Sequence, residues 1–133
     1  MKLTSRSEYA LLALIYLARK EHEGYVSAEH IAKEQDIPLR FLEQILLALK
    51  RARYLMSSKG QHGGFRLAKE PREISMAEII RFFDGALAPT ESVSEYFYES
   101  TPIEKEIKLS AVFKDIRDYT ARRLEETTLA DVS

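Results

Sequence analysis

Long polar side chains recur in the stretch from Pro38 to Arg51, three or four residues apart. On a helix this spacing brings them onto one face, where they can reach the base edges or the phosphates of DNA. The residues concerned, with the two that begin the helix, are Pro38, Leu39, Arg40, Glu43, Gln44, Lys50 and Arg51. The pattern predicts a helix that can lie in a major groove, where arginine pairs with guanine or a phosphate, glutamate with cytosine and glutamine with adenine.

The other face of the same stretch is apolar, which is the arrangement of an amphipathic helix. Its large side chains recur at the same spacing and are Phe41, Leu42, Ile45, Leu46 and Leu49. We expect this face to be core, so that the polar face is turned outward.

A shorter helix is expected just before it, from about Ala28 to Gln35, with Ser27 as its N-cap. The residues from Asp36 to Pro38 form a turn, because proline suits the first turn of the helix that follows. Two helices joined by so few residues have the spacing of a helix-turn-helix. Ser27 is counted among the candidate DNA contacts, whereas His30 is interpreted as a partly exposed packing residue.

Two short strands are expected after the helix pair, at Tyr54–Ser57 and Phe65–Ala68. The loop between them contains Lys59, Gly60 and His62, and it holds three of the chain's five glycines. Glycine lets a backbone approach a phosphate closely. The loop could therefore be the tip of a wing that contacts phosphates or the minor groove, or it could be only a turn.

The first residues of the chain are also candidates for a DNA contact. Lys2 and Arg6 flank hydroxyl side chains and could bind phosphates, while Thr4 or Ser5 could cap the helix that follows. Both roles can hold at once.

That helix is expected from about Arg6 to Lys20, and it is apolar nearly all round in the ten residues from Tyr9 to Ala18. Such a helix is buried on more than one side, against its own module and against a second subunit. Ten residues are far fewer than the roughly 20 that span a bilayer, and Glu8 argues against a secretory leader. We therefore expect a cytoplasmic protein without a membrane partner.

Two more helices are expected in the second half. Ser75 caps one from Met76 to about Asp84, which Gly85 ends and in which Ile79, Ile80, Phe82 and Phe83 supply core. The other runs from Ile107 to about Glu126, with a stripe of Leu109, Val112, Phe113, Ile116, Thr120 and Leu124. About 20 residues of helix span about 30 Å. One small module does not need that length, so we expect the stripe to pair with a second copy, the alternative being packing on its own core.

The segment 86–106 between these helices is the least regular part of the chain. It contains two prolines, five glutamates and the aromatic cluster Tyr96–Tyr98. It is either a plain connection or an effector-sensing loop, and its aromatics are as consistent with a cover over the core as with a ligand site.

Length and charge agree with a nucleic-acid reader. The chain has 133 residues, which suffices for one domain with an appended helix. Residues 1–68 contain 11 Lys and Arg against 7 Asp and Glu, whereas residues 69–133 contain 9 against 14, so the basic half carries the helix-turn-helix. There is no cysteine, which excludes disulfides, a cysteine nucleophile and a thiolate metal site.

Four stretches resemble the Rrf2 family of bacterial winged-helix regulators, and together they span nearly the whole chain. They are Lys2–Leu11, Ile37–Leu46, Lys59–Leu67 and Thr127–Val132. The resemblance implies a mainly α fold, with a winged helix-turn-helix DNA-binding domain and a two-stranded wing at residues 1–85. It further implies a loop at 86–106 and, at 107–133, a long dimerisation helix with a C-terminal tail. The wing and the central residues of the expected recognition helix match the family's DNA-contacting positions.

In cluster-binding members of the family, the loop carries three cysteines that hold an iron–sulfur cluster. Ser92 and Thr101 stand in that neighbourhood here, and hydroxyls are poor ligands for such iron. The three histidines, His22, His30 and His62, all lie in the other half of the chain. We therefore expect no cofactor.

Two positions depart from the family pattern. Arg53 stands just after the recognition helix, where relatives usually have glycine, so the helix must end without the residue that most easily takes a left-handed backbone. Phe65 replaces the usual tyrosine.

These patterns predict a homodimeric repressor that binds a near-palindromic operator in double-stranded DNA, with recognition helices about 34 Å apart. The sequence leaves open whether a small molecule or a partner protein controls this activity, or whether the protein acts constitutively. The competing hypothesis is a module that binds a partner protein, such as a partner enzyme, with DNA binding secondary. An enzyme is not expected, because the chain has no nucleophile paired with a base and no phosphate-cradling or metal-ligand motif.

Overall fold

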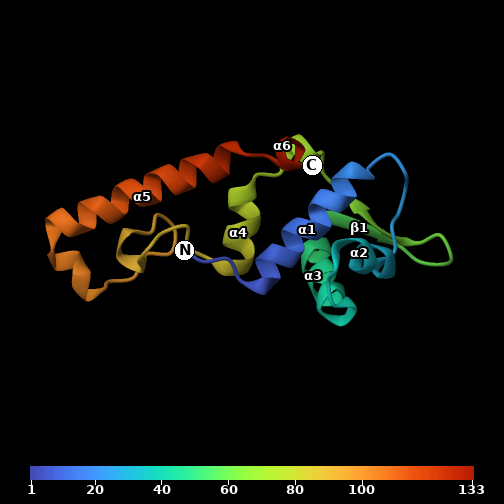
Figure 1. Ribbon diagram of the computed structural model, residues 1–133, viewed down its shortest axis with the longest axis horizontal. Coiled ribbons are helices and arrows are strands. Elements are labelled where there is room, and N and C mark those ends of the chain that lie inside the picture. Colours follow the sequence, from blue (N-terminus) through green and yellow to red (C-terminus); the bar gives the residue numbers. More distant parts are fainter.

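The computed structural model describes all 133 residues and is mainly helical, with one two-stranded antiparallel sheet. In chain order its elements are α1 (Ser5–Arg19), α2 (Ala28–Gln35), α3 (Leu39–Arg51), β1 (Leu55–Ser58), β2 (Gly64–Leu67), η1 (Pro71–Glu73), α4 (Met76–Asp84), η2 (Glu91–Val93), η3 (Pro102–Lys105), α5 (Ile107–Glu126) and α6 (Leu129–Val132), where η marks a short 3-10 helix. Figure 1 shows α1 to α3 and the hairpin gathered at one end, with α5 running out towards the other. No helix has the length and apolar character needed to cross a membrane.

Helix α1 lies at the centre of the core. Ala10, Ala13, Leu14 and Leu17 are buried on it, as the apolar run predicted. The small alanines let neighbouring helices approach closely, and α1 contacts α2, α3, α4, α6 and β2. The helix begins at Ser5 because Thr4 caps it, accepting a hydrogen bond from the Ser7 backbone N–H at 3.3 Å.

Helices α2 and α3 form the predicted helix-turn-helix. Ser27 caps α2 by accepting the backbone N–H of His30 at 3.2 Å, and Asp36 ends it in the left-handed conformation, with φ of 54°. Pro38 stands one position before the first helical residue of α3, rather than inside its first turn.

The apolar face of α3 is core, with one exception. Leu42, Ile45, Leu46 and Leu49 are buried, but Phe41 is 37% exposed, so its prediction as core was wrong. Phe41 lies at the rim, where its ring meets that of Tyr9 edge to face at 5.4 Å. This contact sets the first half of α1 beside the start of α3.

The chain has no glycine at the end of α3, and another residue takes the strained left-handed backbone conformation there. Arg53 itself takes the left-handed backbone, with φ of 69°. The turn is closed by hydrogen bonds from the N–H of Arg53 to the Lys50 carbonyl and from the N–H of Tyr54 to the Leu49 carbonyl, each 2.9 Å. This conformation is sterically unfavourable for an L-residue. The first strand begins directly after the turn.

Both predicted strands were displaced by one residue. The first is Leu55–Ser58 instead of Tyr54–Ser57, and the second is Gly64–Leu67 instead of Phe65–Ala68. They pair antiparallel with Leu55 opposite Leu67. The first strand starts one residue later because Tyr54 belongs to the turn that ends α3.

Helix α4 has the predicted bounds and a complete capping box formed by Ser75 and Glu78. Ile79 and Ile80 are buried as predicted, whereas Phe82 is 48% exposed and does not supply core. It instead packs edge to face against Phe83 at 4.8 Å.

The short helix α6 was not predicted. Thr128 and Asp131 form its capping box, and Leu129 on its first turn is completely buried. The backbone N–H of Leu129 donates to the Ile74 carbonyl at 2.8 Å, so the chain's last residues seal the core beside α4.

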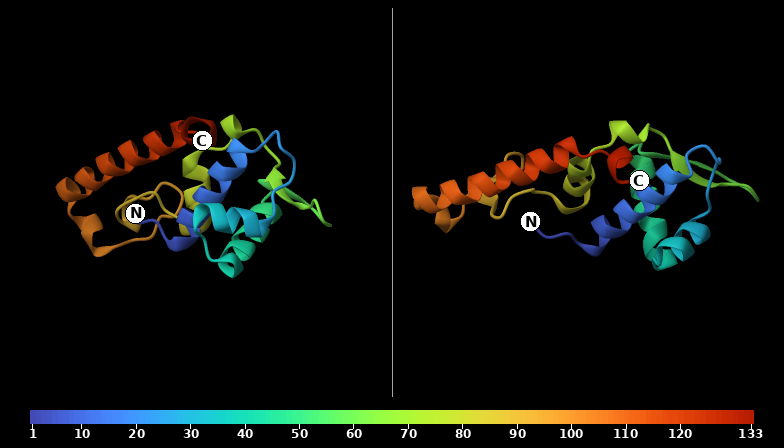
Figure 2. Two further views of the ribbon diagram at one scale, coloured as in Figure 1. Left: turned by 45° about the vertical axis from the view of Figure 1, so that its right-hand side comes forward. Right: turned by 45° about the horizontal axis from the view of Figure 1, so that its top comes forward.

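Helix α5 has the predicted bounds and lies mostly apart from the main core, which it reaches through Leu124. Both views in Figure 2 show the segment 86–106 running alongside it. Ser110 and Ala121 are the residues that α5 buries, and Arg117 donates to the Val93 carbonyl at 2.8 Å. A face of small residues therefore packs on this segment, and the larger apolar residues lie on another side.

A pH-dependent contribution to stability comes from Glu78. Partial burial acts to raise the pKa of its carboxyl, but hydrogen bonds from Ser75 and Tyr54 outweigh this and lower the pKa, with Lys69 assisting. A lowered folded-state pKa stabilises the protein above about pH 4.3, the ordinary value of glutamate, and the contribution is lost as pH falls. We expect Glu78→Gln to cost about 1 kcal/mol at pH 7, a modest value because solvent screens the group.

Urea unfolding at pH 7 and pH 3 measures this. The deficit of Glu78→Gln relative to the wild type should shrink at pH 3, and the exposed Glu73→Gln is the matched control. A deficit of equal size at both pH values would contradict the assignment.

Candidate nucleic-acid interface

The polar face of α3 is exposed and unoccupied by the protein itself. Arg40, Glu43, Gln44, Lys50 and Arg51 are all exposed. None of them belongs to an ion pair within the chain. Exposed charges on a rigid helix that lack internal partners are available to an external one.

The two residues that lead into this face complete its outline. Pro38 is exposed and Leu39 half-buried, at the end of α3 that lies beside the start of α1. Figure 1 shows the first turns of α1 and α3 at the same lower edge of the molecule. The first turn of α1 therefore lies on the same side as the predicted recognition helix, whereas the chain's first residue lies against the segment 86–106, where the Met1 ammonium group donates to the Ala88 carbonyl at 3.1 Å.

The hairpin is anchored to the helix-turn-helix through its second strand. Val26, just before α2, forms a bridge with Phe65, in which N–H to carbonyl hydrogen bonds of 2.9 and 2.8 Å run in both directions. This bridge fixes the hairpin relative to α2, so that the exposed tip, with Lys59, Gly60 and His62, is held at a defined position.

Glycine is required where the hairpin meets Val26. A Cβ added at Gly64 would lie 2.2 Å from the Val26 carbonyl oxygen, and the φ of Gly64 is +143°. A Cβ at Gly63 would lie equally close, 2.2 Å, to the Ser58 carbonyl oxygen. Glycine at position 64 thus allows the hairpin backbone to approach that of Val26, and glycine at position 63 allows the two sides of the hairpin loop to approach each other.

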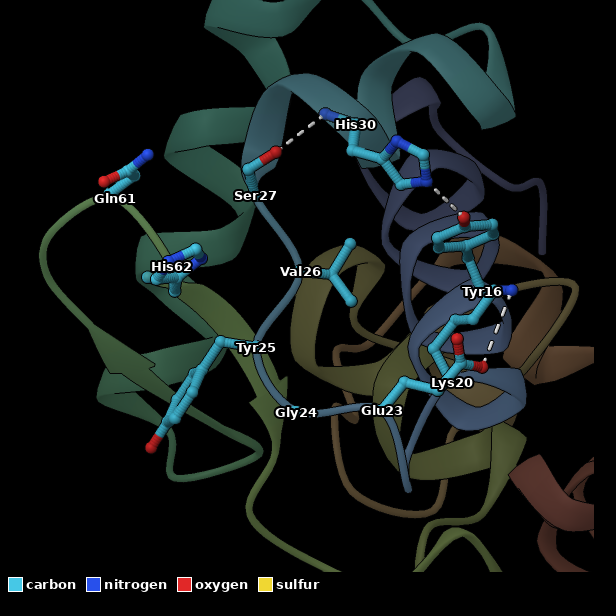
Figure 3. Close-up of a pocket in the computed structure, with 11 residues that line it drawn as sticks. Tyr16, Lys20, Glu23, Gly24, Tyr25, Val26, Ser27, His30, Gln61 and His62 are labelled. Carbon is cyan, nitrogen blue, oxygen red and sulfur yellow. Dashed lines mark hydrogen bonds and ion pairs between the residues drawn. The ribbon is translucent and has the colours of Figure 1, made fainter.

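A pocket of about 660 Å³ opens between the end of α1, the start of α2 and the hairpin tip. It brings together two of the predicted contact residues, Ser27 and His62, which are far apart in sequence (Figure 3). On its α1 side, the Tyr16 hydroxyl and the His30 Nε2 are 2.7 Å apart. His30 is exposed and engaged in this contact, as expected of a surface packing residue.

The N-terminal candidates Lys2 and Arg6 are both exposed. The Arg6 guanidinium lies over the Phe83 ring at 5.4 Å, a cation–π contact that holds the side chain against the end of α4.

One cation of the hairpin was not among the sequence candidates. Arg66 is exposed on β2, with its guanidinium 5.0 Å from the centre of the Tyr25 ring. Strand alternation could have revealed it, since Phe65 and Leu67 on either side are partly buried.

The segment 86–106 is closed by its own hydroxyl groups. Thr101 donates to Ser92 at 2.7 Å, and the Thr90 and Thr101 hydroxyl oxygens are 3.3 Å apart. The aromatic cluster does not cover the core, because Tyr96 is 64% exposed and Tyr98 is 55% exposed. Of the two interpretations of these aromatics, the core cover was wrong.

The predicted dimerisation stripe is largely uncovered. Leu109, Val112 and Ile116 are between 44% and 53% exposed, while Phe113 and Thr120 are partly buried. Leu124 packs against the hydrophobic core of its own chain, which departs from the prediction, because the end of α5 approaches α1 and α4.

Two helices in helix-turn-helix arrangement, followed by an anchored hairpin, define a winged helix-turn-helix protein. The chain belongs to the Rrf2 family, whose model, described as an iron-dependent transcriptional regulator, matches residues 3–133. The curated regulator CymR of Bacillus subtilis is 32% identical over 133 residues, covering 100% of this chain and 90% of CymR.

Solved structures agree with this assignment. The structure of CymR from B. subtilis superposes with a TM-score of 0.79 at 31% identity, covering 99% of this chain and 95% of that one. IscR of T. potens superposes with a TM-score of 0.72 at 30% identity, covering 99% and 85%. The chain is accordingly a DNA-binding transcription regulator with the predicted mainly α winged-helix fold.

The family description raises the question of iron. The residues present do not suit an iron–sulfur cluster, because the chain has no cysteine and the Ser92 and Thr101 hydroxyls are hydrogen-bonded to each other. No group of three or more His, Asp or Glu side chains is placed to hold a metal ion.

The close contact at Gly64 yields a prediction about the wing. Gly64→Ala should cost about 1–3 kcal/mol through strain and clash, and it should weaken binding to a mixed-sequence DNA duplex by displacing the hairpin. Thermal unfolding and fluorescence anisotropy measure the two effects.

The control is Gly24→Ala, which has a similarly strained φ of +83° but no atom within 4 Å of the added Cβ. We expect it to lower stability less and to leave DNA affinity near the wild-type value. Equal effects of both variants on DNA affinity would show that the Val26 contact does not set the wing.

Proposed function

We propose that the protein is a homodimeric repressor that reads a near-palindromic operator with the exposed face of α3. The observation that carries this proposal is the set of five exposed polar side chains on α3 that have no ion-pair partner within the chain. In a dimer, two such helices enter major grooves about 34 Å apart.

The contacts divide by chemistry. Arg40 donates to guanine or a phosphate, Glu43 accepts from the cytosine amino group, and Gln44 pairs with adenine. Lys59, Gly60 and His62 bring the wing tip to the minor groove or its phosphates. The remaining candidates contact the backbone or shape the approach to it, and they are Lys2, Arg6, Ser27, Pro38, Leu39, Lys50 and Arg51.

Dimerisation through α5 accounts for its exposed stripe. Leu109, Val112 and Ile116 form an apolar row that a single chain leaves in water. Phe113 borders this row, and Thr120 extends it. A symmetric partner would remove this row from solvent. Burial of apolar surface is favourable, so the exposed row favours dimerisation. Leu124 contributes mainly to its own core and is a minor member of the interface.

The protein acts without an iron–sulfur cofactor, and its signal reaches it as another small molecule, as a partner protein, or not at all. A protein partner is favoured by the exposed aromatics Tyr96 and Tyr98 beside the acidic residues of the same segment. A module that binds such a partner, with DNA binding secondary, is the second candidate function.

Replacing Glu43 tests the reading role of α3. Glu43→Ala should relax the preference at one base pair of each half-site by about 1–3 kcal/mol, because a carboxylate discriminates cytosine from other bases. Binding of operator variants, measured by anisotropy against the wild type, gives this number.

Lys59→Ala is the comparison variant, since a phosphate contact weakens all sequences and lowers the salt slope by about one. If Glu43→Ala weakened every sequence equally, Glu43 would not be a base reader, and the choice between DNA and a protein partner would reopen.

Charges on the α5 stripe test the dimer. Val112→Asp together with Ile116→Asp should give monomers in analytical ultracentrifugation, because burying two carboxylates in an apolar interface is costly. Lys108→Asp and Asp115→Lys on the same helix are exposed control changes outside the stripe. A dimer that persists in the Val112 and Ile116 variant would refute this interface.

A further inference from the structure

The end of α4 holds the start of α1 through one carboxylate. Asp84, the last residue of α4, accepts hydrogen bonds from the Thr4 hydroxyl at 2.5 Å and the Ser7 hydroxyl at 2.6 Å. It also accepts the Thr4 backbone N–H at 3.2 Å. Three donors on one carboxylate, from residues about 80 positions away, fix the beginning of α1 in place.

These contacts lie within the N-terminal stretch that carries the candidate phosphate contacts. Lys2 is two residues before Thr4, and Arg6 lies between Thr4 and Ser7. Ser7 is completely buried and Asp84 is half-buried, so their hydrogen bond is partly sheltered from water, whereas the two bonds from Thr4 are exposed. Arg6 is held by the neighbouring Phe83, so two adjacent residues of α4 hold this arm.

The same helix contacts the C-terminal half of the chain. One turn before Asp84, the Arg81 guanidinium is ion-paired with Glu125 of α5 at 2.8 Å and lies 4.8 Å from the centre of the Tyr96 ring. Figure 1 shows α4 standing between α1 and α5. Helix α4 is therefore packed against both the DNA-binding end and the segment that α5 supports.

We propose that Asp84 is a positioning residue for DNA binding: it orients the arm so that Lys2 and Arg6 meet the phosphates. Asp84 is itself an anion and repels DNA, so its contribution is made through Thr4 and Ser7. This inference rests on the proposed phosphate contacts of the arm.

The experiment measures DNA affinity against salt concentration on a mixed-sequence 30-base-pair duplex. Each phosphate contact contributes about 0.9 to the slope of log affinity against log salt. Lys2→Ala combined with Arg6→Ala should lower the slope by about two, and Asp84→Asn should lower it by about one to two. The triple variant should fall no further than the Lys2 and Arg6 pair.

Whether Asp84→Asn weakens or strengthens DNA binding distinguishes a positioning role of Asp84 from the simple effect of its negative charge. Removing a negative charge by itself strengthens binding to DNA, so a weaker Asp84→Asn protein reports a lost orientation. Glu91→Gln is the matched control, because it removes an equal charge at an exposed site with no bond to the arm. It should keep the wild-type slope.

The same measurements separate the phosphate contacts of the arm from the role of Asp84. If Lys2→Ala with Arg6→Ala keeps the wild-type slope, the arm does not contact phosphates and the proposal for Asp84 fails with it. If that pair lowers the slope but Asp84→Asn does not, or if the triple variant adds the two losses, Asp84 positions nothing. Should Asp84→Asn melt below the assay temperature, Ser7→Ala, which keeps the charge, must show a slope reduced by about one, and an unchanged slope overturns the proposal.

Discussion

The packing of α1 against α2, α3, α4, α6 and β2 is the constraint on which the structure depends. Its buried residues Leu14 and Leu17 each contribute about 1.5–3 kcal/mol of hydrophobic stabilisation, and the buried alanines Ala10, Ala13 and Ala18 on either side of them let neighbouring helices approach closely. Because α1 packs against both α3 and α4, it fixes the orientation of these two helices relative to each other, although Leu12 on α1 stays 36% exposed. The outward face of the recognition helix is a consequence of this burial.

Much of the fold could be predicted, because the signals were local. The bounds of α2, α4 and α5 follow from caps and from apolar spacing, and the structure has them as expected. Helix α6 was missed because four residues are too few for a periodic pattern, and its stability comes from burying Leu129 rather than from propensity. Phe41 and Phe82 were misplaced because spacing cannot tell the centre of a buried face from its rim.

In the candidate interface, too, local features could be predicted from the sequence and features that depend on long-range contacts could not. The exposed face of α3 could be predicted from its own residues, whereas the position of the wing could not, since it depends on the bridge between Val26 and Phe65. Asp84 had no sequence signal beyond ending a helix, because its partners are some 80 positions away. The hydroxyl contacts of Ser92 and Thr101 show how this segment, which has no cysteine, is closed by its own side chains.

Recognition of a particular DNA sequence by this regulator can be measured by selecting bound fragments from genomic DNA with the purified protein at two salt concentrations. We expect a near-palindromic motif whose half-site centres lie about one helical turn apart, with retention that falls steeply as salt rises. Fragments retained without any shared motif, or no retention at either salt concentration, would contradict this expectation and favour a protein partner.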